Sequence, residues 1–301
     1  MDNFKNDINR RKFIEAGLKT AGAAALATVP SLKSFAGKRE YTVNDVIEII
    51  YKDVPGAGFN RQTVDTIKSG AGLAKVNGIV TTMFPTIEVI RKTIAMDVNF
   101  IIAHGDTFYN YADDINWAGP SNVVKQKQEM LVQNGITIWR FHDNWHDHHP
   151  DGIVYGVLKK LNWLKYNSTG EKTFSIPPSS LKQIIDYLKT SLGIDHVRVI
   201  GDLSASCEKI TFLPGAWAGQ NQIKKIELDN PDLAIVGELH EWETGEFIRD
   251  ARLLGSKTSL VVLGHSVSEE PGMEYLVDWL QPKLEGIKVS HIASNSPFTW
   301  A

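Results

Sequence analysis

Histidine and carboxylate side chains gather in four short segments of the chain, and each segment follows a run of apolar residues. The segments hold His104 with Asp106, the stretch 142–149, Glu238 with His240 and Glu241, and His265 with Glu269. Imidazole and carboxylate groups together suit zinc, iron or manganese as ligands. The chain has a single cysteine, Cys207, which excludes an internal disulfide and a cysteine-rich metal site. We therefore expect any metal centre to use histidine and carboxylate ligands.

Each segment taken alone also has a simpler explanation. His104 could be a core histidine bonded to a backbone carbonyl, and the stretch 142–149 could be a solvated polar loop. Glu269 could cap the helix that begins near His265, and the segment 238–241 could be an exposed turn. The combination is more informative, because seven of the nine histidines fall in these segments or directly after one.

The apolar runs predict the elements that position these side chains. Short, uniformly apolar runs indicate buried strands, and apolar residues at helical spacing indicate helices. The expected strands are 76–83, 100–103 and 136–141, and the expected helices are 43–51, 86–96 and 123–134. Strands that alternate with helices favour parallel pairing in an α/β fold. Because the carboxyl ends of parallel strands meet at one edge of a sheet, the polar side chains that follow them should converge there.

A second, inserted lobe is expected over residues 155–230, where the character of the sequence changes. This region contains a predicted helix, a β-rich stretch and a polar segment, at 180–192, 196–200 and 215–222. Buried strands then return at 233–236 and 259–264, with a helix over 244–254 between them.

The first 36 residues are typical of a twin-arginine export signal. Arg10 and Arg11 precede an apolar stretch over residues 16–29, and small residues then offer cleavage after Ala36. The stretch contains Lys19 and is shorter than the roughly 20 residues that a membrane-spanning helix needs. We therefore expect an exported protein, periplasmic or otherwise extracytoplasmic, without stable membrane insertion once the signal is removed.

Composition and missing motifs exclude several other classes of protein. The 301 residues are 43% hydrophobic and 22% charged, as in ordinary soluble globular proteins. A net charge of −3 lacks the basic footprint of a nucleic-acid binder. A dinucleotide-binding fingerprint is also absent, because Gly70-Ala71-Gly72 is not followed by the third glycine, and no P-loop pattern occurs.

The order of the histidine motifs resembles that of the NIF3-like (DUF34) family of dinuclear metal-centre proteins. The resemblance rests on an apolar strand followed by His104, on His142-x-x-x-His146 followed by Asp151-Gly152, and on Gly264-His265-x-x-x-Glu269. The segments 63–70, 78–83 and 106–110 are also similar, and the likeness runs from about Val43 to Phe298.

This resemblance implies a fold and a site over residues 37–301. It implies two interleaved α/β lobes, a cleft between them that binds two divalent ions per subunit, and a ring-shaped homohexamer. The ligands that it implies are His104, His146, His265 and Glu269, with Asp106 as an additional ligand. His142 and Asp147 are then expected to transfer protons or to orient other groups. The chain departs from the family at Gly105, which replaces a second ligand, and at His146, which replaces an aspartate in many members.

The function expected from these residues is metal-assisted hydrolysis of a small-molecule substrate such as a phosphorylated or nucleotide-like compound. Paired metal ions activate water and stabilise developing negative charge. A protein that stores, delivers or senses metal without catalysis would use the same ligands. A purely structural metal is a third alternative, and its removal should unfold the chain.

Overall fold

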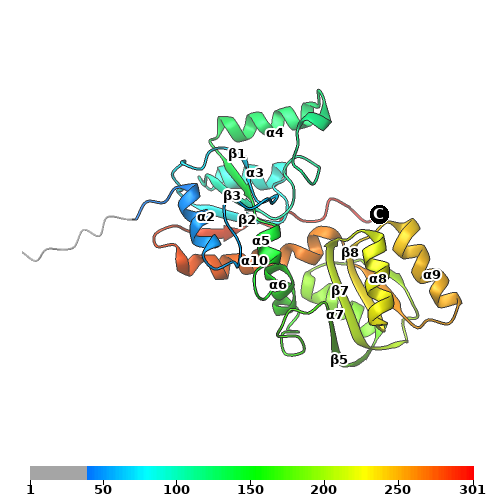
Figure 1. Ribbon diagram of the computed structural model, residues 1–301. Coiled ribbons are helices and arrows are strands. Elements are labelled where there is room, and N and C mark those ends of the chain that lie inside the picture. The colour runs from blue at the N-terminus through cyan, green and yellow to red at the C-terminus, as the bar shows by residue number, and fades with distance from the viewer. Residues whose placement is uncertain (1–38) are drawn as a thin grey trace, which may run out of the picture. The chain divides into compact units, whose positions relative to one another are not determined.

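The computed structural model describes residues 39–301, and the predicted export signal over residues 1–36 lies outside this range. Residues 40–301 form two five-stranded sheets with helices on both faces of each (Figure 1). The α/β fold class predicted from the sequence is confirmed. In the described range, no helix has both the length and the apolar character that crossing a membrane requires.

The first sheet consists of short strands, and its three central strands are completely buried. Its order is β1 (Ile67–Ser69), β4 (Thr137–Arg140), β3 (Phe100–Ala103), β2 (Ile79–Thr82) and β10 (Val289–His291). Strands β4, β3, β2 and β10 are parallel, and β1 runs antiparallel to β4. Because parallel strands covered on both faces have no solvent side, they consist of nearly continuous apolar residues. This is why the sequence identified β3 without ambiguity.

Helices cover the two faces of the first sheet separately. The helices concerned are α2 (Val43–Tyr51), α3 (Ile87–Ala95) and α4 (Asn122–Gln133). Phe100 and Ile102 of β3 join the core that contains α2, whereas Ile101 joins the core that contains α3 and α4. Helix α2 begins at the predicted residue, and α3 and α4 begin within one residue of the predicted start. The Thr42, Thr86 and Ser121 side chains each accept a hydrogen bond from the first helical turn.

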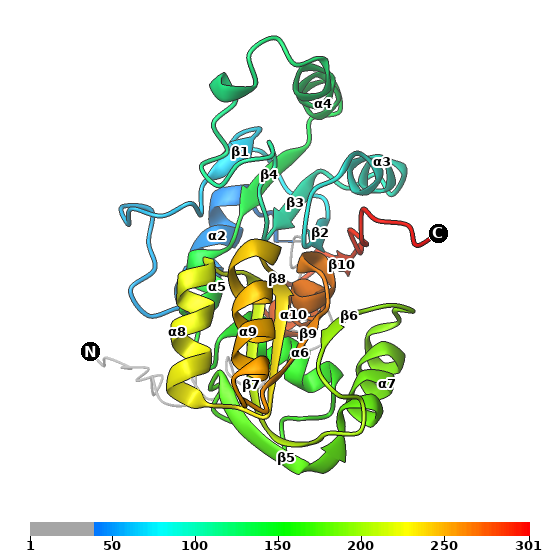
Figure 2. The same ribbon diagram turned by 90° about the vertical axis from the view of Figure 1, so that its right-hand side faces the viewer.

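The second sheet has a parallel centre and antiparallel edges. Its order is β5 (Thr173–Ser180), β7 (Ser206–Ala216), β8 (Leu233–Glu238), β9 (Ser259–Val262) and β6 (Arg198–Ile200). One face is covered by α6 (Gly152–Lys160) and α7 (Leu181–Leu192), and the other by α8 (Gly219–Asp229) and α9 (Glu246–Leu253). Figure 2 shows α8 and α9 side by side across this second face.

The long helix α10 (His265–Leu280) connects the two sheets. It begins directly after β9, contacts β7 and β8 near its start, and then packs against the first sheet through Met273, Leu276 and Leu280. It crosses α6 at Gly156 and Gly272, where a Cβ atom on Gly156 would lie 2.5 Å from the Gly272 Cα. The remaining short helical elements are α5 (Asp143–His146), η1 (Asn116–Ala118), η2 (Glu241–Gly245) and η3 (Gln281–Lys283).

The second sheet extends further along the chain than the inserted lobe of residues 155–230 expected from the sequence. Strands β8 and β9 were predicted as buried strands, and both lie in the second sheet, where β8 pairs with β7 and β9, and β9 pairs with β8 and β6. Strand β7 itself was not predicted, and the polar segment over 215–222 contains its end and the start of α8. The alternation of polar and apolar residues is weak there, because β7 is buried on both faces over much of its length.

Candidate metal centre

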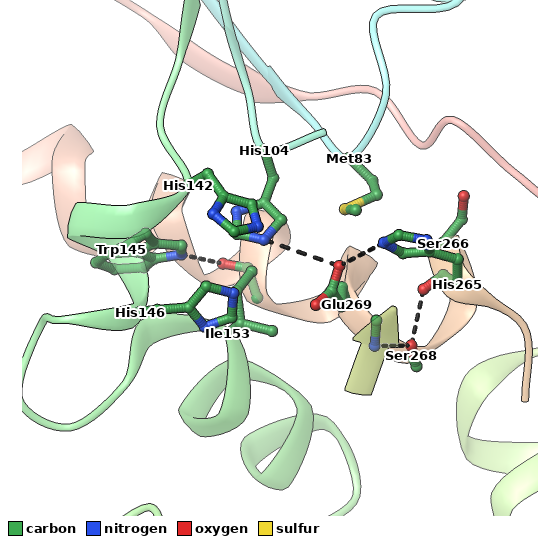
Figure 3. Close-up of polar contacts among 12 residues, drawn as sticks. Met83, His104, His142, Trp145, His146, Ile153, His265, Ser266, Ser268 and Glu269 are labelled. Atoms are coloured by element: carbon green, nitrogen blue, oxygen red, sulfur yellow. Dashed lines mark hydrogen bonds and ion pairs between the residues drawn. The ribbon is translucent and has the colours of Figure 1, made fainter. Parts of the chain in front are cut away.

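Four histidines and one glutamate approach one another from both sheets. His104 directly follows β3, His142 follows β4, and His146 is the last residue of α5. His265 is the first residue of α10, and Glu269 lies one turn further along that helix. The carboxyl ends of β3 and β4 therefore meet the end of β9 through the start of α10, as Figure 3 shows. The convergence expected at the ends of parallel strands occurs.

Three of these histidines form one tight cluster. One nitrogen from each of His104, His142 and His146 lies within 4.8 Å of the others. The His104 ring stacks on His142 with 4.5 Å between ring centroids, and both rings meet His146 edge-on at 5.0 Å. His104 is completely buried. Burial and the neighbouring His142 and His146 lower the pKa of His104 well below its ordinary value, so its imidazole is neutral.

His104, His142 and His146 each hydrogen-bond an oxygen at Nδ1, and His265 has a carboxylate oxygen in ion-pair contact with its Nδ1. The Nδ1 contacts are Phe141 O for His104 at 3.1 Å, Asp143 Oδ1 for His142 at 2.9 Å, Asp151 Oδ2 for His146 at 3.1 Å, and Glu238 Oε2 for His265 at 3.4 Å. An acceptor at Nδ1 holds the ring proton there and leaves the Nε2 lone pair available. The four imidazoles are therefore arranged to present Nε2, which is how histidine is oriented in metal sites.

Glu269 lies between the histidines of the two sheets. Its Oε2 atom is 3.2 Å from His265 Nε2 and 3.8 Å from His104 Nε2 (Figure 3). Both His104 Nε2 and Glu269 Oε2 are buried, and neither makes a hydrogen bond within the described residues, so the ion pair with His265 is the closest polar contact of Glu269 Oε2 there. A buried polar atom without a partner is costly to a fold. A cation in contact with both atoms would satisfy them, and neutral imidazole with carboxylate is a suitable donor set for a divalent metal.

The backbone near Glu269 depends on two glycines. Gly215 of β7 has φ 72°, and a Cβ atom there would lie 2.2 Å from Glu269 Oε1. A Cβ atom on Gly237 of β8 would lie 2.4 Å from the Gly215 backbone and 2.5 Å from Ser268 Oγ. The Ser268 hydroxyl accepts a hydrogen bond from Gly215 N at 2.9 Å and donates one to His265 O at 2.8 Å. The start of α10 is thereby fixed against the ends of β7 and β8.

The carboxylates make the His265 and His146 positions attractive to positive charge. Burial alone would lower the pKa of His265, but Glu238 and Glu269 raise it to about 10. Burial likewise opposes protonation of His146, and the hydrogen bond to Asp151 outweighs it, so the pKa of His146 is raised. A metal ion that binds at either ring would have to displace a proton that these carboxylates stabilise.

Comparison with known proteins places the chain in a family. A family model described as Duf34/NIF3 (NGG1p interacting factor 3) matches residues 41–297. The chain belongs to this family.

The sequence alignments of this NIF3 protein with two relatives extend over most of both chains. It is 23% identical over 256 residues to a Clostridium perfringens protein named "GTP cyclohydrolase 1 type 2 homolog", covering 81% of this chain and 92% of that one. A Chlamydia muridarum protein of the same name is 20% identical and covers 78% of this chain and 89% of its own.

Solved structures share the fold of the NIF3 protein at low identity. A Staphylococcus aureus protein superposes with TM-score 0.69 at 16% identity, covering 87% of this chain and 99% of that one. A Bacillus cereus protein related to NIF3 gives TM-score 0.66 at 14% identity, with 87% and 100% coverage. These likenesses confirm the NIF3-like fold expected from the sequence.

A cavity of about 690 Å³ opens beside the histidines and is lined from both sheets. This volume is in the range of small-molecule sites, about 300–1,000 Å³. Its wall includes Phe84, Tyr111 and Trp217 as aromatic residues, and Arg140 and Lys172 as basic ones. His142, His146, His265 and Glu269 face the same cavity. A ligand in the cavity would therefore lie against the histidine cluster.

The other predicted site residues have different surroundings. Asp106 lines the cavity, and burial together with Asp113 raises its pKa, but no contact joins its carboxylate to the four histidines among the described residues. Asp147 is absent from the cavity wall in the described part of the chain and pairs with Arg61. Asp143, not Asp147, contacts a histidine of the site.

The space beside Gly105, where a side chain would extend, is filled by an aromatic ring. A Cβ atom at this position would lie 2.2 Å from Phe84 Cε1, so the Phe84 ring occupies the space into which a side chain at 105 would extend. The same ring meets His265 edge-on at 5.2 Å between centroids. Phe84 gives the cavity an apolar wall at this point.

Sequence reasoning did not single out the acceptors at Nδ1. Asp143 and Asp151 lie close to their histidines along the chain, and Asp151 also begins α6 as its N-cap and pairs with Lys172. Glu238 was recognised only as part of a polar segment with His240 and Glu241. Those two residues are exposed and do not line the cavity within the described chain.

Proposed function

We propose that this NIF3-family protein is a metal-dependent hydrolase that acts on a small molecule bound in the cavity between its two sheets. The observation that carries the proposal is the pair of buried atoms His104 Nε2 and Glu269 Oε2. They lie 3.8 Å apart beside an open cavity, and neither hydrogen-bonds to a residue of the part of the chain that the structure describes. A cation supported by these donors would be adjacent to any substrate in that cavity.

The residues suited to hold metal form two groups that share Glu269. His104 and His146 belong to the cluster at the first sheet, and His265 belongs to the start of α10. Glu269 contacts His104 on one side and His265 on the other, and a carboxylate in this position can bridge two ions. We therefore propose two divalent ions, with these four residues as ligands.

The bound metal would act as a Lewis acid and would lower the pKa of water toward neutrality. His142 is placed to take up the proton released in hydrolysis. Burial and His146 lower the pKa of His142, so its ring is neutral near pH 7. Asp143 holds the Nδ1 proton and leaves Nε2 to accept another. Asp143 stabilises the positive charge that then forms on the ring.

The basic and aromatic residues of the cavity support a substrate with a flat or anionic part. Lys172 and Arg140 line it together with Phe84, Tyr111 and Trp217. Phosphate esters, nucleotides and cyclic amides are therefore the compounds to test.

The experiment is a hydrolysis screen with these compounds, run on metal-loaded protein with and without a chelator. Turnover that disappears with chelator and returns with added metal is the expected result. Metal binding without turnover on any compound would instead favour the alternative of a non-catalytic protein that stores or delivers metal. The contact of Phe84 with Gly105 favours that alternative. The apolar Phe84 ring occupies the space that a metal-binding side chain at residue 105 would need, so the site has one ligand fewer.

A further inference from the structure

A carboxylate from the second sheet contacts the Nδ1 atom of His265, the ring nitrogen that does not contact Glu269. Glu238 is the last residue of β8, lines the cavity and keeps 51% of its side chain exposed. Its Oε2 atom is 3.4 Å from His265 Nδ1, while Glu269 Oε2 is 3.2 Å from His265 Nε2. The two carboxylates therefore contact opposite nitrogens of one ring, and only Glu269 is on the side that faces His104.

The position of Glu238 is fixed by its backbone. Gly264 N donates to Gly237 O at 2.8 Å, which joins the end of β8 to the residue before His265. Gln222 Nε2 donates to Glu238 O at 2.9 Å from the other side. Gly237 also lies close to Ser268, so the end of β8 packs directly against the first turn of α10. The carboxylate of Glu238 therefore extends from a rigid strand end toward His265.

We infer that Glu238 is a positioning residue that holds the proton of His265 on Nδ1 and directs the Nε2 lone pair toward the metal site beside Glu269. A neutral imidazole carries one ring proton, and an acceptor at one nitrogen decides which nitrogen is free. His104 and His146 obtain the same effect from Phe141 O and Asp151, within the first sheet and its connections. Glu238 does this for His265 from the second sheet.

This role rests on the proposed function, because it requires metal at His265. Partners that orient a metal-binding histidine typically change metal affinity by about 10- to 100-fold when they are removed. Glu238→Ala removes the acceptor, and Glu238→Gln keeps an acceptor oxygen without the charge. Glu241→Ala is the matched control, because Glu241 is an exposed glutamate three residues away that pairs with Arg198.

The test measures Zn²⁺ affinity by competition with a chromophoric chelator, on the full chain and on these three variants. We expect Zn²⁺ binding to be about 10- to 100-fold weaker in Glu238→Ala, close to that of the unmodified protein in Glu238→Gln, and unchanged in Glu241→Ala. Thermal unfolding of the metal-free proteins should be similar, because the Glu238 side chain is half exposed.

Three outcomes would overturn the inference in distinguishable ways. Zn²⁺ affinity of Glu238→Ala within twofold of the unmodified protein would remove the positioning role. Equal weakening in Glu238→Gln and Glu238→Ala would assign the effect to charge and not to the acceptor at Nδ1. Absence of Zn²⁺ binding by the unmodified protein would overturn the proposed function itself, and with it any role for Glu238 toward metal.

Discussion

His104 Nε2 and Glu269 Oε2 lie 3.8 Å apart in the interior, and neither atom hydrogen-bonds to any residue in the described range 39–301. The two residues come from opposite parts of the fold, since His104 ends a strand of the first sheet and Glu269 lies in the helix that leaves the second. Folding thus brings a neutral imidazole and a carboxylate together at the edge of a cavity. The account of function depends on this relationship.

Removal of His265 should remove metal from the protein. His265→Ala deletes one proposed ligand and leaves Glu269 without its 3.2 Å partner. We expect metal content after dialysis to fall to a small fraction of that of the unmodified protein. His240→Ala is the control, because His240 is exposed and contacts Glu243 and Trp242, neither of which is a proposed ligand. Full metal occupancy in folded His265→Ala, measured by elemental analysis, would reject His265 as a ligand.

Gly215→Ala should displace Glu269. The added methyl group would lie 2.2 Å from Glu269 Oε1, and overpacking of this kind costs about 1–3 kcal/mol. Gly193→Ala is the matched control, since Gly193 also has positive φ, 68°, but has no atom within 4 Å of its Cβ position. The extra loss of unfolding free energy in Gly215→Ala should be accompanied by weaker Zn²⁺ binding. Equal stability losses in the two variants would contradict the contact.

Gly105→Ala should be destabilising because of Phe84. A Cβ atom at residue 105 would lie 2.2 Å from the Phe84 ring, which predicts a cost of about 1–3 kcal/mol in urea unfolding. Phe84→Ala opens that space, so the double variant should lose less stability than the sum of the single variants. Contacting residues typically couple by about 0.5–3 kcal/mol. Strict additivity would show that Phe84 does not limit side chains at 105.

Cys207 should be unreactive in the folded protein. Burial, with a smaller effect of Asp232, raises the pKa of its thiol from 9.0 to about 11. The folded chain therefore holds the thiol proton more tightly than the unfolded chain, and this contribution to stability is complete below pH 9 and is lost as the pH rises through 11. At pH 8 the thiolate fraction is about a hundredfold lower than for an ordinary thiol.

Labelling with a thiol-specific chromogenic reagent at pH 8 tests this expectation. The folded protein should react at least a hundredfold more slowly than the protein unfolded in urea. Comparable rates in the two states would show that Cys207 is accessible. Slow labelling of the folded protein would agree with the buried position of Cys207.

The sequence predicted best the parts of the fold whose signal is local. Strand β3 is four consecutive apolar residues, and helix α2 has a threonine cap and an apolar stripe, so both were placed correctly. Strand β7 was missed because its pairing partners are distant in sequence and its burial on both faces removes the alternating pattern. The assignment of β8 and β9 to a sheet likewise depends on pairing that no local pattern reveals.

At the site, the position of residues just after predicted strands indicated the candidate ligands, but it did not indicate which carboxylates contact the histidines. His104, His146, His265 and Glu269 could be proposed from type and position, and the structure brings them together. Glu238 could not be assigned, because its contact with His265 arises only when β8 lies beside the start of α10. Asp143 was not singled out beside Asp147, because short spacing does not reveal which carboxylate of a helical turn points toward a histidine. The hexamer and the export signal remain predictions.

Metal content per folded chain tests the central claim most directly. The full-length protein is saturated with Zn²⁺ or Mn²⁺, dialysed and measured by elemental analysis, beside a Glu269→Gln variant. We predict two ions per chain in the unmodified protein and a clear loss in Glu269→Gln, because that residue is proposed to join the two groups of ligands. No bound metal in the unmodified protein, or full occupancy in Glu269→Gln, would contradict the account.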